Sequence, residues 1–464
     1  MKIAVTDKKN SGNKFVETLF SEKISQSRVA SKNDKEFLEI KIPKKGKMNR
    51  RKWILLSRAV VQEAKKNRIK NILIDWQKLT DFDNIGDDLA QIFAENVLMA
   101  NYEFCRYKKK PKEGWDNISE IQIIAGKKEK TSLQYKMRRG MIVAQEVNFC
   151  RDLANIPGVD MTPEILVKET RRAIRGSGIS MKVLEEREMK QKKMGGILAV
   201  GSGSQYKPKF IILEYKGGVK TKKPIVLVGK GVTFDSGGID TKPHPYALDM
   251  MMDMSGGAAV ISAIITAEKL KLKKNIVALI PAVENMPSGT SFRPGDIVKV
   301  MDGTTVEVGH TDAEGRLILA DALTYAKLFD PEIVIDVATL TGASLSALGE
   351  RASAIFSNDN ELAKKTVDFS EKVGDYVWRM PLWEEYESDI KGTHGDISNI
   401  NTKAKPGYGG AITAAIFLKH FAQKYKSWMH IDIAPKITAV FDENLAKGAA
   451  GAPVRLLVKL LEKL

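Results

Sequence analysis

Cysteine is nearly absent from this sequence, which has only Cys105 and Cys150 among 464 residues. Two cysteines cannot form the disulfide framework of a small secreted module, so we expect a reducing compartment. Long apolar runs are also missing, because the longest, 276–283, is far shorter than the roughly 18 residues of a membrane helix. The first ten residues contain no apolar stretch typical of a signal peptide. We therefore expect a cytoplasmic protein without membrane contact.

Several common catalytic motifs are missing as well. Pro224 stands where a P-loop ending at Lys230 requires glycine, and Gly231 follows that lysine in place of Ser or Thr. GSGS at 201–204 lacks the third glycine of a dinucleotide fingerprint, and the GxSxG elbow of serine hydrolases does not occur. None of the five histidines has a partner at the i, i+4 spacing of a helical zinc site, which disfavours a mononuclear His-based zinc enzyme.

What the sequence does have is a large apolar content and an excess of positive charge. With 43% hydrophobic and 28% charged residues it can bury a large core, and its length suggests about two to four domains. The formal net charge is +17, and residues 1–150 hold 32 Lys and Arg against 19 Asp and Glu, whereas residues 151–464 hold 42 against 38. This regional excess is typical of a solvated basic face, or alternatively of a contact with nucleic acid.

Short β-rich runs alternate with helix-length spacers along the chain, which is typical of an α/β protein with largely parallel sheets. Strands are predicted at 37–42, 69–76, 119–126, 209–215, 224–229, 275–283, 331–340 and 427–434. Helices are predicted at 51–66, 86–102, 132–153 and 317–328. Asp302 and Gly303 predict a hairpin turn between 297–301 and 304–308. We expect a first domain at 1–130, a linker helix at 131–153 and a second domain at 154–464.

Two loops concentrate residues that can carry chemistry. The loop after 224–229 holds several acidic and basic side chains beside glycines: Lys230, Asp235, Lys242, Asp249 and Asp253. Because ligands of open α/β sheets gather at the carboxyl ends of strands, we expect chemistry here and in the loops after 304–308 and 334–340.

The second loop, HTDAEGRL at 310–317, contains Asp312, Glu314 and Arg316. In an extended chain Asp312 and Glu314 point to the same side. The helix predicted next places Arg316 near a helix N-terminus, where a bound anion is favoured. The alternative is that Arg316 is only a salt-bridge partner of the two carboxylates.

Together these loops contain four carboxylates, which repel one another unless basic groups or cations lie between them. Oxygen-rich ligation with few imidazoles suits a pair of divalent ions such as Mg²⁺, Mn²⁺ or Zn²⁺ bridged by shared carboxylates. The sequence therefore predicts a dinuclear metal site.

At 228–238 and 310–317 the sequence resembles the leucyl, or cytosol, aminopeptidases. HTDAEGRL matches seven of the eight positions of the family signature NTDAEGRL. Further matching segments are DMSGGAA at 253–259, ENMPSG at 284–289, RPGD at 293–296, DVATLTGA at 336–343, RMPLW at 379–383, DISN at 396–399 and GGAITAA at 409–415. The resemblance covers most of 145–464, whereas 1–130 match only in general pattern.

The resemblance implies a fold and a set of metal ligands. The fold is α/β with two domains: a smaller N-terminal domain with a parallel-rich sheet, and a larger C-terminal catalytic domain with a central mixed sheet flanked by helices. The ligands of the tightly held metal are Lys230, Asp235, Asp253 and Glu314. The ligands of the exchangeable metal are Asp235, Asp312 and Glu314. Lys230 can ligate only as a neutral amine, so nearby dications must lower its pKa from about 10.4.

The implied activity is metal-dependent removal of N-terminal residues, preferentially leucine or other apolar residues, from short peptides. A water bridging two ions, Mn²⁺ or Zn²⁺ with Mg²⁺ or Co²⁺ as alternatives, attacks the carbonyl while Lys242 stabilises the oxyanion. Arg316 holds a bicarbonate that serves as general base. The pocket for the first side chain is formed by Met250, Thr339, Gly342 and Ala434. Met250 alternatively only packs the core.

Two positions depart from the family pattern. His310 replaces the usual Asn of the signature, and Pro435 stands where Gly is common. Groups around metal ligands alter metal affinity by 10- to 100-fold, so we hypothesise that His310 shifts the pH or metal preference.

The resemblance also implies a homohexamer with active sites facing an internal cavity. The alternative function is a nucleic-acid-binding or regulatory protein on a retained peptidase scaffold, with the basic first domain as its contact. The complete ligand set favours the enzyme, and the two roles are compatible.

Overall fold

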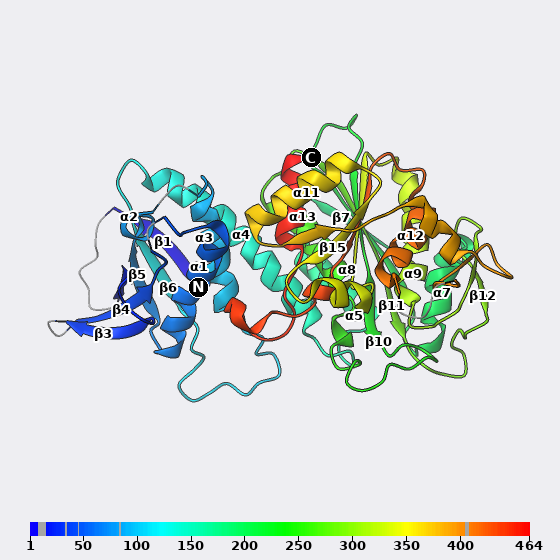
Figure 1. The fold of residues 1–464 in the computed structure, drawn as a ribbon, viewed down its shortest axis with the longest axis horizontal. Coiled ribbons are helices and arrows are strands. Elements are labelled where there is room, and N and C mark those ends of the chain that lie inside the picture. The colour runs from blue at the N-terminus through cyan, green and yellow to red at the C-terminus, as the bar shows by residue number, and fades with distance from the viewer. Residues whose placement is uncertain (8–14, 33–34, 45, 83–84, 404–407) are drawn as a thin grey trace. The chain divides into compact units, whose positions relative to one another are not determined.

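The computed structural model describes residues 1–464 except 8–14, 33–34, 45, 83–84 and 404–407 (Figure 1). It divides the chain into two compact units: the first is Met1–Asn148 with Ala439–Lys447, and the second is Phe149–Thr438 with Gly448–Leu464. The division falls inside helix α4 (Lys130–Ala154), which coincides within one residue at each end with the linker helix expected at 131–153. The return of residues 439–447 to the first unit has no signal in the sequence.

The first unit is an α/β unit built on a six-stranded sheet. In spatial order its strands are β1 (Lys2–Thr6), β6 (Glu120–Ile124), β5 (Asn71–Asp75), β2 (Val16–Ser21), β4 (Lys35–Lys41) and β3 (Arg28–Lys32). Among the described strands of this sheet only the β3–β4 pair is antiparallel, so the expected parallel-rich sheet is confirmed. Its helices are α1 (Arg50–Lys66), α2 (Trp76–Leu79), α3 (Leu89–Asn101) and most of α4.

Helix α1 shows how the sequence directs this unit. Asn49 caps the helix, because its side chain accepts a hydrogen bond from Lys52 N at 2.9 Å. The apolar face that includes Trp53, Val60 and Val61 is fully buried, while the basic residues 51 and 52 are exposed.

The second unit is built on a nine-stranded mixed sheet. Eight strands lie in the order β16 (Val377–Arg379), β15 (Ser353–Ser357), β18 (Trp428–Asp432), β14 (Ile333–Ala338), β9 (Ile225–Gly229), β11 (Asn275–Asn285), β8 (Lys209–Lys216) and β7 (Ile179–Leu184). The ninth strand, β10 (Gly231–Asp235), pairs with the far end of β11. The antiparallel pairs are β7–β8, β8–β11 and β15–β18.

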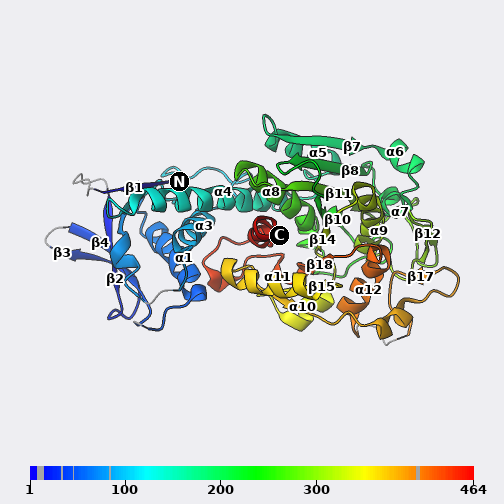
Figure 2. The ribbon, with the colours of Figure 1, turned by 90° about the horizontal axis from the view of Figure 1, so that it is seen from above.

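Helices cover both faces of this sheet (Figure 2). They are α5 (Pro163–Ala173), α6 (Glu186–Gln191), α7 (Gly195–Val200), α8 (Ser255–Lys269), α9 (Glu314–Ala326), α10 (Gly342–Leu348), α11 (Asn360–Val373), α12 (Gly410–Ala422) and α13 (Val454–Lys463). Helices α7, α9 and α12 form one apolar core with Val226 and Val228 of β9. Helix α8 packs against β9, β11 and β14 and contacts α13. The expected mixed sheet flanked by helices is confirmed.

A small third sheet carries the predicted hairpin. Strands β12 (Ile297–Lys299) and β13 (Thr305–Glu307) pair antiparallel, and β17 (Ile397–Ser398) joins β13 in parallel. Gly303 has a φ of +98°, which glycine adopts without strain. The hairpin prediction is therefore confirmed, and β13 leads the chain into residues 310–317.

One segment, Met250–Lys269, is long and apolar enough to cross a membrane by length and composition. Within the second unit, 89% of its most apolar window is buried. Such burial is typical of a core helix, and most of this segment is α8.

Candidate metal centre

Five strands of the second unit run parallel and end at one edge of its sheet: β9, β10, β11, β14 and β18. A cavity of about 670 Å³ opens at this edge. It is lined by Lys230, Asp235, Lys242, Pro243, Pro245, Tyr246, Leu248, Asp249, Met250, Asp253, Asp312, Arg316, Thr339, Leu340, Thr341, Gly342, Ala343, Leu345, Gly410, Ala434 and Ile437. Ten of the eleven predicted site residues are in this lining. The eleventh, Glu314, is buried and contacts Lys230.

Local backbone features place the charged groups. Lys230 is the single residue between β9 and β10, and its N–H donates to the carbonyl of Val337 at 3.0 Å. Glycine is needed at 315, because a Cβ there would lie 2.6 Å from Cε of Lys230. Gly237 and Gly238 have positive φ values of 92° and 71°, which lets the chain turn sharply after β10 toward Lys242.

Lys230 lies between two buried carboxylates. Its Nζ is 2.8 Å from Oδ2 of Asp253 and 2.7 Å from Oε1 of Glu314. It also donates to the carbonyl oxygen of Thr339 at 3.1 Å. The hydroxyl of Thr339 in turn donates to Oδ1 of Asp253 at 2.6 Å. Thr339, predicted only as a pocket residue, therefore also orients a predicted metal ligand.

Lys242 lies between the other two carboxylates. Its Nζ is 2.9 Å from Oδ2 of Asp235 and forms a second ion pair with Asp312. One ligand oxygen each from Asp235, Asp312 and Glu314 lies within 4.8 Å of the others. Glu314 is the first residue of α9, so the side chains of Asp312 and Glu314 converge through a helix start. The extended-chain geometry expected for this pair is wrong.

The electrostatics of the cluster show a shortage of positive charge. Burial, together with Asp235 and Glu314, raises the pKa of Asp312 to about 7 despite the opposing effect of Lys242. Burial also raises the pKa of Asp253 and of Glu314. Burial alone would lower the pKa of Lys230, but the surrounding carboxylates raise it above its ordinary value. A cluster that favours protonated acids and charged lysines is one that additional cations would stabilise.

Arg316 lies in the first turn of α9, as predicted. One terminal nitrogen donates to the carbonyl of Asn399 at 2.5 Å, and within the part of the chain that the structure describes its buried Nε has no hydrogen-bond partner. Burial lowers the pKa of Arg316 to about 10, against the opposing effect of Glu314, Asp432 and Asp312. Among the described residues it forms no ion pair with Asp312 or Glu314, so the salt-bridge alternative is not what the structure shows. The guanidinium group of Arg316 lines the cavity, where an anion can approach it.

The four predicted pocket residues all line the cavity. Met250 belongs to a helical turn, Met250–Met252, in which Met252 is buried and Met250 is half-buried. The core-packing alternative therefore describes Met252 better than Met250. Thr339 and Gly342 follow β14, and Ala434 follows β18.

Sequence reasoning missed two asparagines that hold the acidic loops. Asn285 ends β11 and donates to Oδ1 of Asp235 at 2.9 Å and to the carbonyl of Thr311 at 3.2 Å. Asn399 accepts from Gly309 N at 2.7 Å and donates to the carbonyl of His310 at 2.7 Å. Both lie in segments that match the family, ENMPSG at 284–289 and DISN at 396–399. The match indicates that these asparagines are important, but it does not show which residues they contact.

His310 is half-exposed and does not reach the ligand oxygens. Its Nδ1 accepts a hydrogen bond from the N–H of Asp312 at 3.2 Å and lies 3.6 Å from Oδ2 of Asp240. An Asn side chain makes the same contact with the N–H two residues ahead. His310 therefore acts on the backbone that carries Asp312.

Comparison with known proteins decides the family. The sequence profile of the cytosol aminopeptidase family, catalytic domain, matches residues 148–458, and that of its N-terminal domain matches 43–111. A probable cytosol aminopeptidase of Methylobacillus flagellatus is 42% identical over 365 residues, which cover 78% of this chain and 72% of the relative. One of Syntrophotalea carbinolica is 43% identical over 377 residues, with 81% and 75% covered. The chain belongs to the cytosol aminopeptidase family.

Two solved structures of another protein have the same fold as this member of the cytosol aminopeptidase family. The bottromycin maturation enzyme BotP in complex with Mn has a TM-score of 0.86 and 27% identity, and the match covers 99% of each chain. A second structure of BotP has a TM-score of 0.85 and 28% identity, with 96% of this chain and 98% of the other covered. The family consists of metal-dependent aminopeptidases, which are hydrolases. The carboxylates of Asp235, Asp312 and Glu314 are close enough together to share such a metal.

Proposed function

We propose that this protein is a dinuclear metalloaminopeptidase that releases N-terminal amino acids, preferentially leucine or other apolar residues, from short peptides. The observation that carries this proposal is the cluster of Lys230, Asp235, Asp253, Asp312 and Glu314 at a cavity whose lining also contains many apolar side chains. Its raised carboxyl pKa values and its close oxygen atoms support two divalent cations rather than a purely structural ion-pair network.

The side chains of the cluster divide into two overlapping sets of ligands, one for each cation. We assign Lys230, Asp235, Asp253 and Glu314 to the tightly held ion, because these side chains are buried. We assign Asp235, Asp312 and Glu314 to the exchangeable ion, because Asp312 is the least buried of the acids. Mn²⁺ and Zn²⁺ are the proposed ions, with Mg²⁺ and Co²⁺ as alternatives. Ion binding requires Lys230 to lose its proton and the carboxyl groups to lose theirs.

The residues around the cluster perform the remaining tasks. Two divalent cations held by these side chains would supply polarisation of the peptide carbonyl and a water of lowered pKa. Lys242 donates to the oxyanion that develops on the substrate, because its ammonium group borders the cavity beside Asp235 and Asp312. Arg316 binds bicarbonate through its guanidinium group, which lines the cavity, and this places a proton acceptor near the cluster.

The apolar side of the cavity selects the substrate. Met250, Thr339, Gly342 and Ala434 offer small or flexible surfaces that accept a branched aliphatic side chain. Gly342 has no atoms within 4 Å of the position of a Cβ, so the pocket is open at this point. Leucine or methionine at the N-terminus of a short peptide fits this wall.

The test is hydrolysis of leucine p-nitroanilide after EDTA treatment and return of Mn²⁺, Zn²⁺ or Co²⁺. Wild type should lose activity with EDTA and regain it with metal, and Asp312→Ala should regain at most about one hundredth, because a metal ligand is missing. Asp302→Ala is the matched control, since it removes an exposed carboxylate in the β12–β13 turn. Metal-independent turnover, or a fully active Asp312→Ala, would contradict the proposal.

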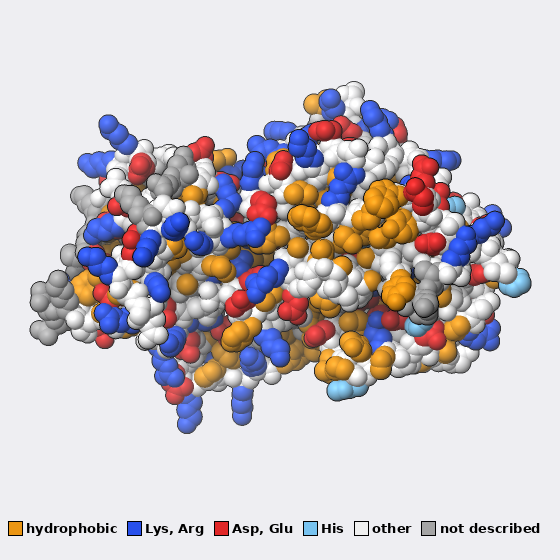
Figure 3. All heavy atoms as spheres, viewed as in Figure 1, with side chains coloured by type: hydrophobic (Ala, Val, Ile, Leu, Met, Phe, Trp, Pro, Cys, Tyr) orange, Lys and Arg blue, Asp and Glu red, His pale blue; other side chains and the backbone are white. Residues whose placement is uncertain are grey.

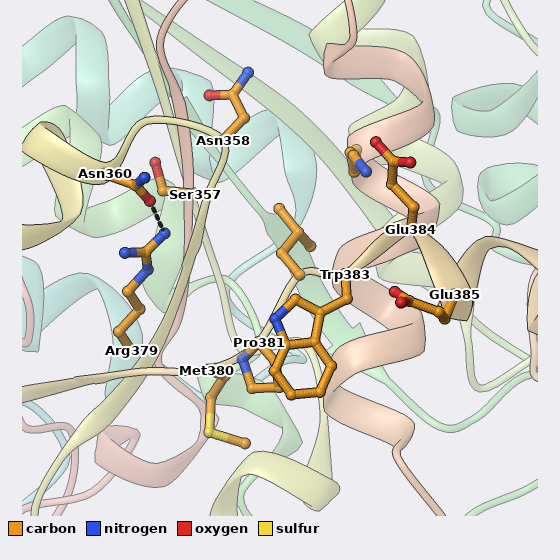
Figure 4. A pocket seen from close by; sticks show the side chains of 11 residues that line it. Ser357, Asn358, Asn360, Arg379, Met380, Pro381, Trp383, Glu384 and Glu385 are labelled. Carbon is orange, nitrogen blue, oxygen red and sulfur yellow. Dashed lines mark hydrogen bonds between the residues drawn. The ribbon is translucent and has the colours of Figure 1, made fainter.

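We also propose that the protein forms a homohexamer in the cytoplasm, as the names of its relatives suggest for the compartment. Hydrophobic side chains gather on one face of the second unit (Figure 3). Around Trp383, which is 63% exposed, lies a hollow of about 1380 Å³ whose lining includes Arg379, Met380 and Glu384 (Figure 4). An exposed tryptophan beside charged groups is typical of a surface that contacts another chain.

The basic first unit supports a second, compatible role in nucleic-acid binding. The exposed segment 106–112 contains Arg106, Lys108, Lys109, Lys110 and Lys112, with Tyr107 52% exposed. If this segment contacts phosphates, changing Lys108, Lys109 and Lys110 to Glu should weaken DNA binding and flatten its salt dependence. Equal binding by the variant would exclude this contact.

A further inference from the structure

Asp432 has an unusual place beside the cavity. It is the last residue of β18, its side chain is 1% exposed, and it does not belong to the cavity lining. Its Oδ1 accepts hydrogen bonds from Leu340 N at 3.0 Å and from Ala434 N at 3.1 Å. Its Oδ2 accepts from the hydroxyl of Thr341 at 2.7 Å. One carboxylate therefore satisfies three donors.

These three donors come from two separate segments of the cavity lining, residues 339–345 and residues 434–437, here called its two walls. Leu340 and Thr341 lie in the loop that follows β14, and Ala434 begins the turn that follows β18. Thr341 is also the N-cap of α10, since its hydroxyl oxygen accepts from Ser344 N at 3.1 Å. The carboxylate of Asp432 thus joins the loop after β14, the start of α10 and the turn after β18.

We propose that Asp432 is a positioning residue that sets the width of the pocket for the substrate's first side chain. The proposal rests on the proposed function, because it concerns the pocket formed by Met250, Thr339, Gly342 and Ala434. Thr339 and Gly342 flank the two residues that Asp432 holds on one wall, and Ala434 is held directly on the other wall. If the carboxylate is lost, the two walls are no longer tied to each other.

The negative charge of Asp432 is required for this arrangement. An ionised carboxylate offers about four lone-pair sites and no donor, so it can accept from all three groups at once. Hydrogen bonds to an ionised acceptor are shorter and stronger than neutral ones. An Asn of the same volume replaces one accepting oxygen with an NH₂ group, which cannot accept the proton of Thr341. Asp432→Asn therefore weakens the link between the walls without leaving a cavity.

Asp432 has a second effect that the experiment must separate. Its charge opposes the burial that lowers the pKa of Arg316. A neutral residue at 432 therefore removes one negative charge from the surroundings of Arg316, and any effect of this change on kcat is common to all substrates. The ratio of kcat/KM between two substrates with different first side chains cancels this common effect and reports only on the pocket.

Asp336, on the strand that pairs with β18, provides a matched control. Asp336 on β14 is fully buried, and its Oδ2 accepts from Trp428 Nε1 at 2.7 Å while its Oδ1 lies 2.5 Å from Nδ1 of His430. Asp336 lies on β14, which pairs with β18, the strand of Asp432. Among the described residues, its side chain makes no hydrogen bond or ion pair with a residue of the cavity lining. Asp336→Asn should lower the melting temperature and leave substrate discrimination unchanged.

The test compares leucine p-nitroanilide with alanine p-nitroanilide on the metal-loaded full-length protein. Asp432→Asn should reduce the leucine-to-alanine ratio of kcat/KM about fivefold or more, chiefly through a higher KM for the leucine substrate, since fit around a few methylene groups controls discrimination of this size. Thr341→Val should reduce the ratio less, and Thr341→Ser, which keeps the hydroxyl, should restore it.

The outcomes separate this inference from the proposed function. If wild type hydrolyses neither substrate with any metal, the proposed function fails and the pocket assignment fails with it. If wild type prefers leucine but Asp432→Asn and Thr341→Val leave the ratio unchanged, only the positioning role is wrong. Should Asp432→Asn not fold, the Thr341→Val and Thr341→Ser pair decides the question. An equal change in Asp336→Asn would show that the ratio follows general stability and would also overturn the inference.

Discussion

At the scale of single residues, Lys242 is the clearest case of a side chain whose chemistry depends on its surroundings. Asp235 and Asp312 both pair with its ammonium group, and the carboxylates raise its pKa despite burial, so it stays charged beside the cavity. Lys242→Met should therefore lower kcat about 100- to 1000-fold with little change in KM, since a donor to the oxyanion acts mainly in the transition state. Steady-state kinetics would check this. A drop confined to KM would assign Lys242 to substrate binding instead.

His310 allows a second prediction at this scale. Its Nδ1 accepts a hydrogen bond from the N–H of Asp312, which is assigned to the exchangeable metal. An Asn at 310 can accept the same N–H, but with a side chain of different length and polarity. His310→Asn should therefore shift the Mn²⁺ affinity or the pH profile of leucine p-nitroanilide hydrolysis, up to about tenfold in affinity. Identical profiles for the two proteins would refute the hypothesis.

Sequence patterns identified some residues of the site and missed others. Lys230, Asp235, Asp253, Asp312 and Glu314 were recognisable because their short-range spacing matches a family signature, and the structure brings them together. Asn285, Asn399 and Asp432 were not, because their roles arise where separate loops meet. Nothing within one segment shows that a strand-ending Asp will accept hydrogen bonds from two other loops.

At the scale of elements, strands β14 and β18 contain a buried ion pair below the cavity edge. Burial would lower the pKa of His430, but Asp336 raises it above its ordinary value. A histidine whose pKa is higher in the folded than in the unfolded state stabilises the fold fully below about pH 6.5, and this contribution is lost as pH rises through the folded pKa.

His430→Gln tests this ion pair. At pH 6 it should lower the free energy of unfolding by about 3 kcal/mol, because Asp336 loses a charged partner in the core. The difference from wild type should shrink as pH rises toward 9. Urea unfolding at several pH values measures both proteins. A difference that is constant or grows with pH would show that the pair is not charged in the fold.

Strands with continuous apolar runs were predicted well, whereas several strands without such a run were missed. β9, β11, β14 and β18 follow their predicted segments because they are buried on both faces. β10 was taken as part of a loop, since only Lys230 separates it from β9. Short, half-exposed strands such as β1 and β3 lack the apolar alternation that would reveal them.

At the scale of the whole molecule, the proposed hexamer gives a prediction about Trp383. Replacing this 63% exposed side chain with Asp places a charge on the apolar surface of the second unit. If the surface lies between chains, Trp383→Asp should reduce the mass measured by light scattering from six chains to fewer, because a buried unpaired charge is costly. Exposed Lys273→Asp serves as a control. An unchanged hexamer would place the interface elsewhere, and a monomeric wild type would contradict the assembly.

The net charge also belongs to this scale. Four of the residues assigned to metals are acidic, so a protein with two divalent cations bound is more positive than its formal +17. The regional excess in the first 150 residues has no part in the proposed chemistry, which makes nucleic-acid binding and peptide hydrolysis separable by experiment.

The central claim is that Lys230 and the four carboxylates together hold two divalent cations. Titration of Mn²⁺ into EDTA-treated protein, followed by calorimetry, tests this most directly. The account predicts two bound ions per chain in wild type and one in Asp312→Ala, with protons released on binding because Lys230 and the raised carboxyl groups must lose them. Absence of Mn²⁺ binding by wild type, or two ions in Asp312→Ala, would contradict it.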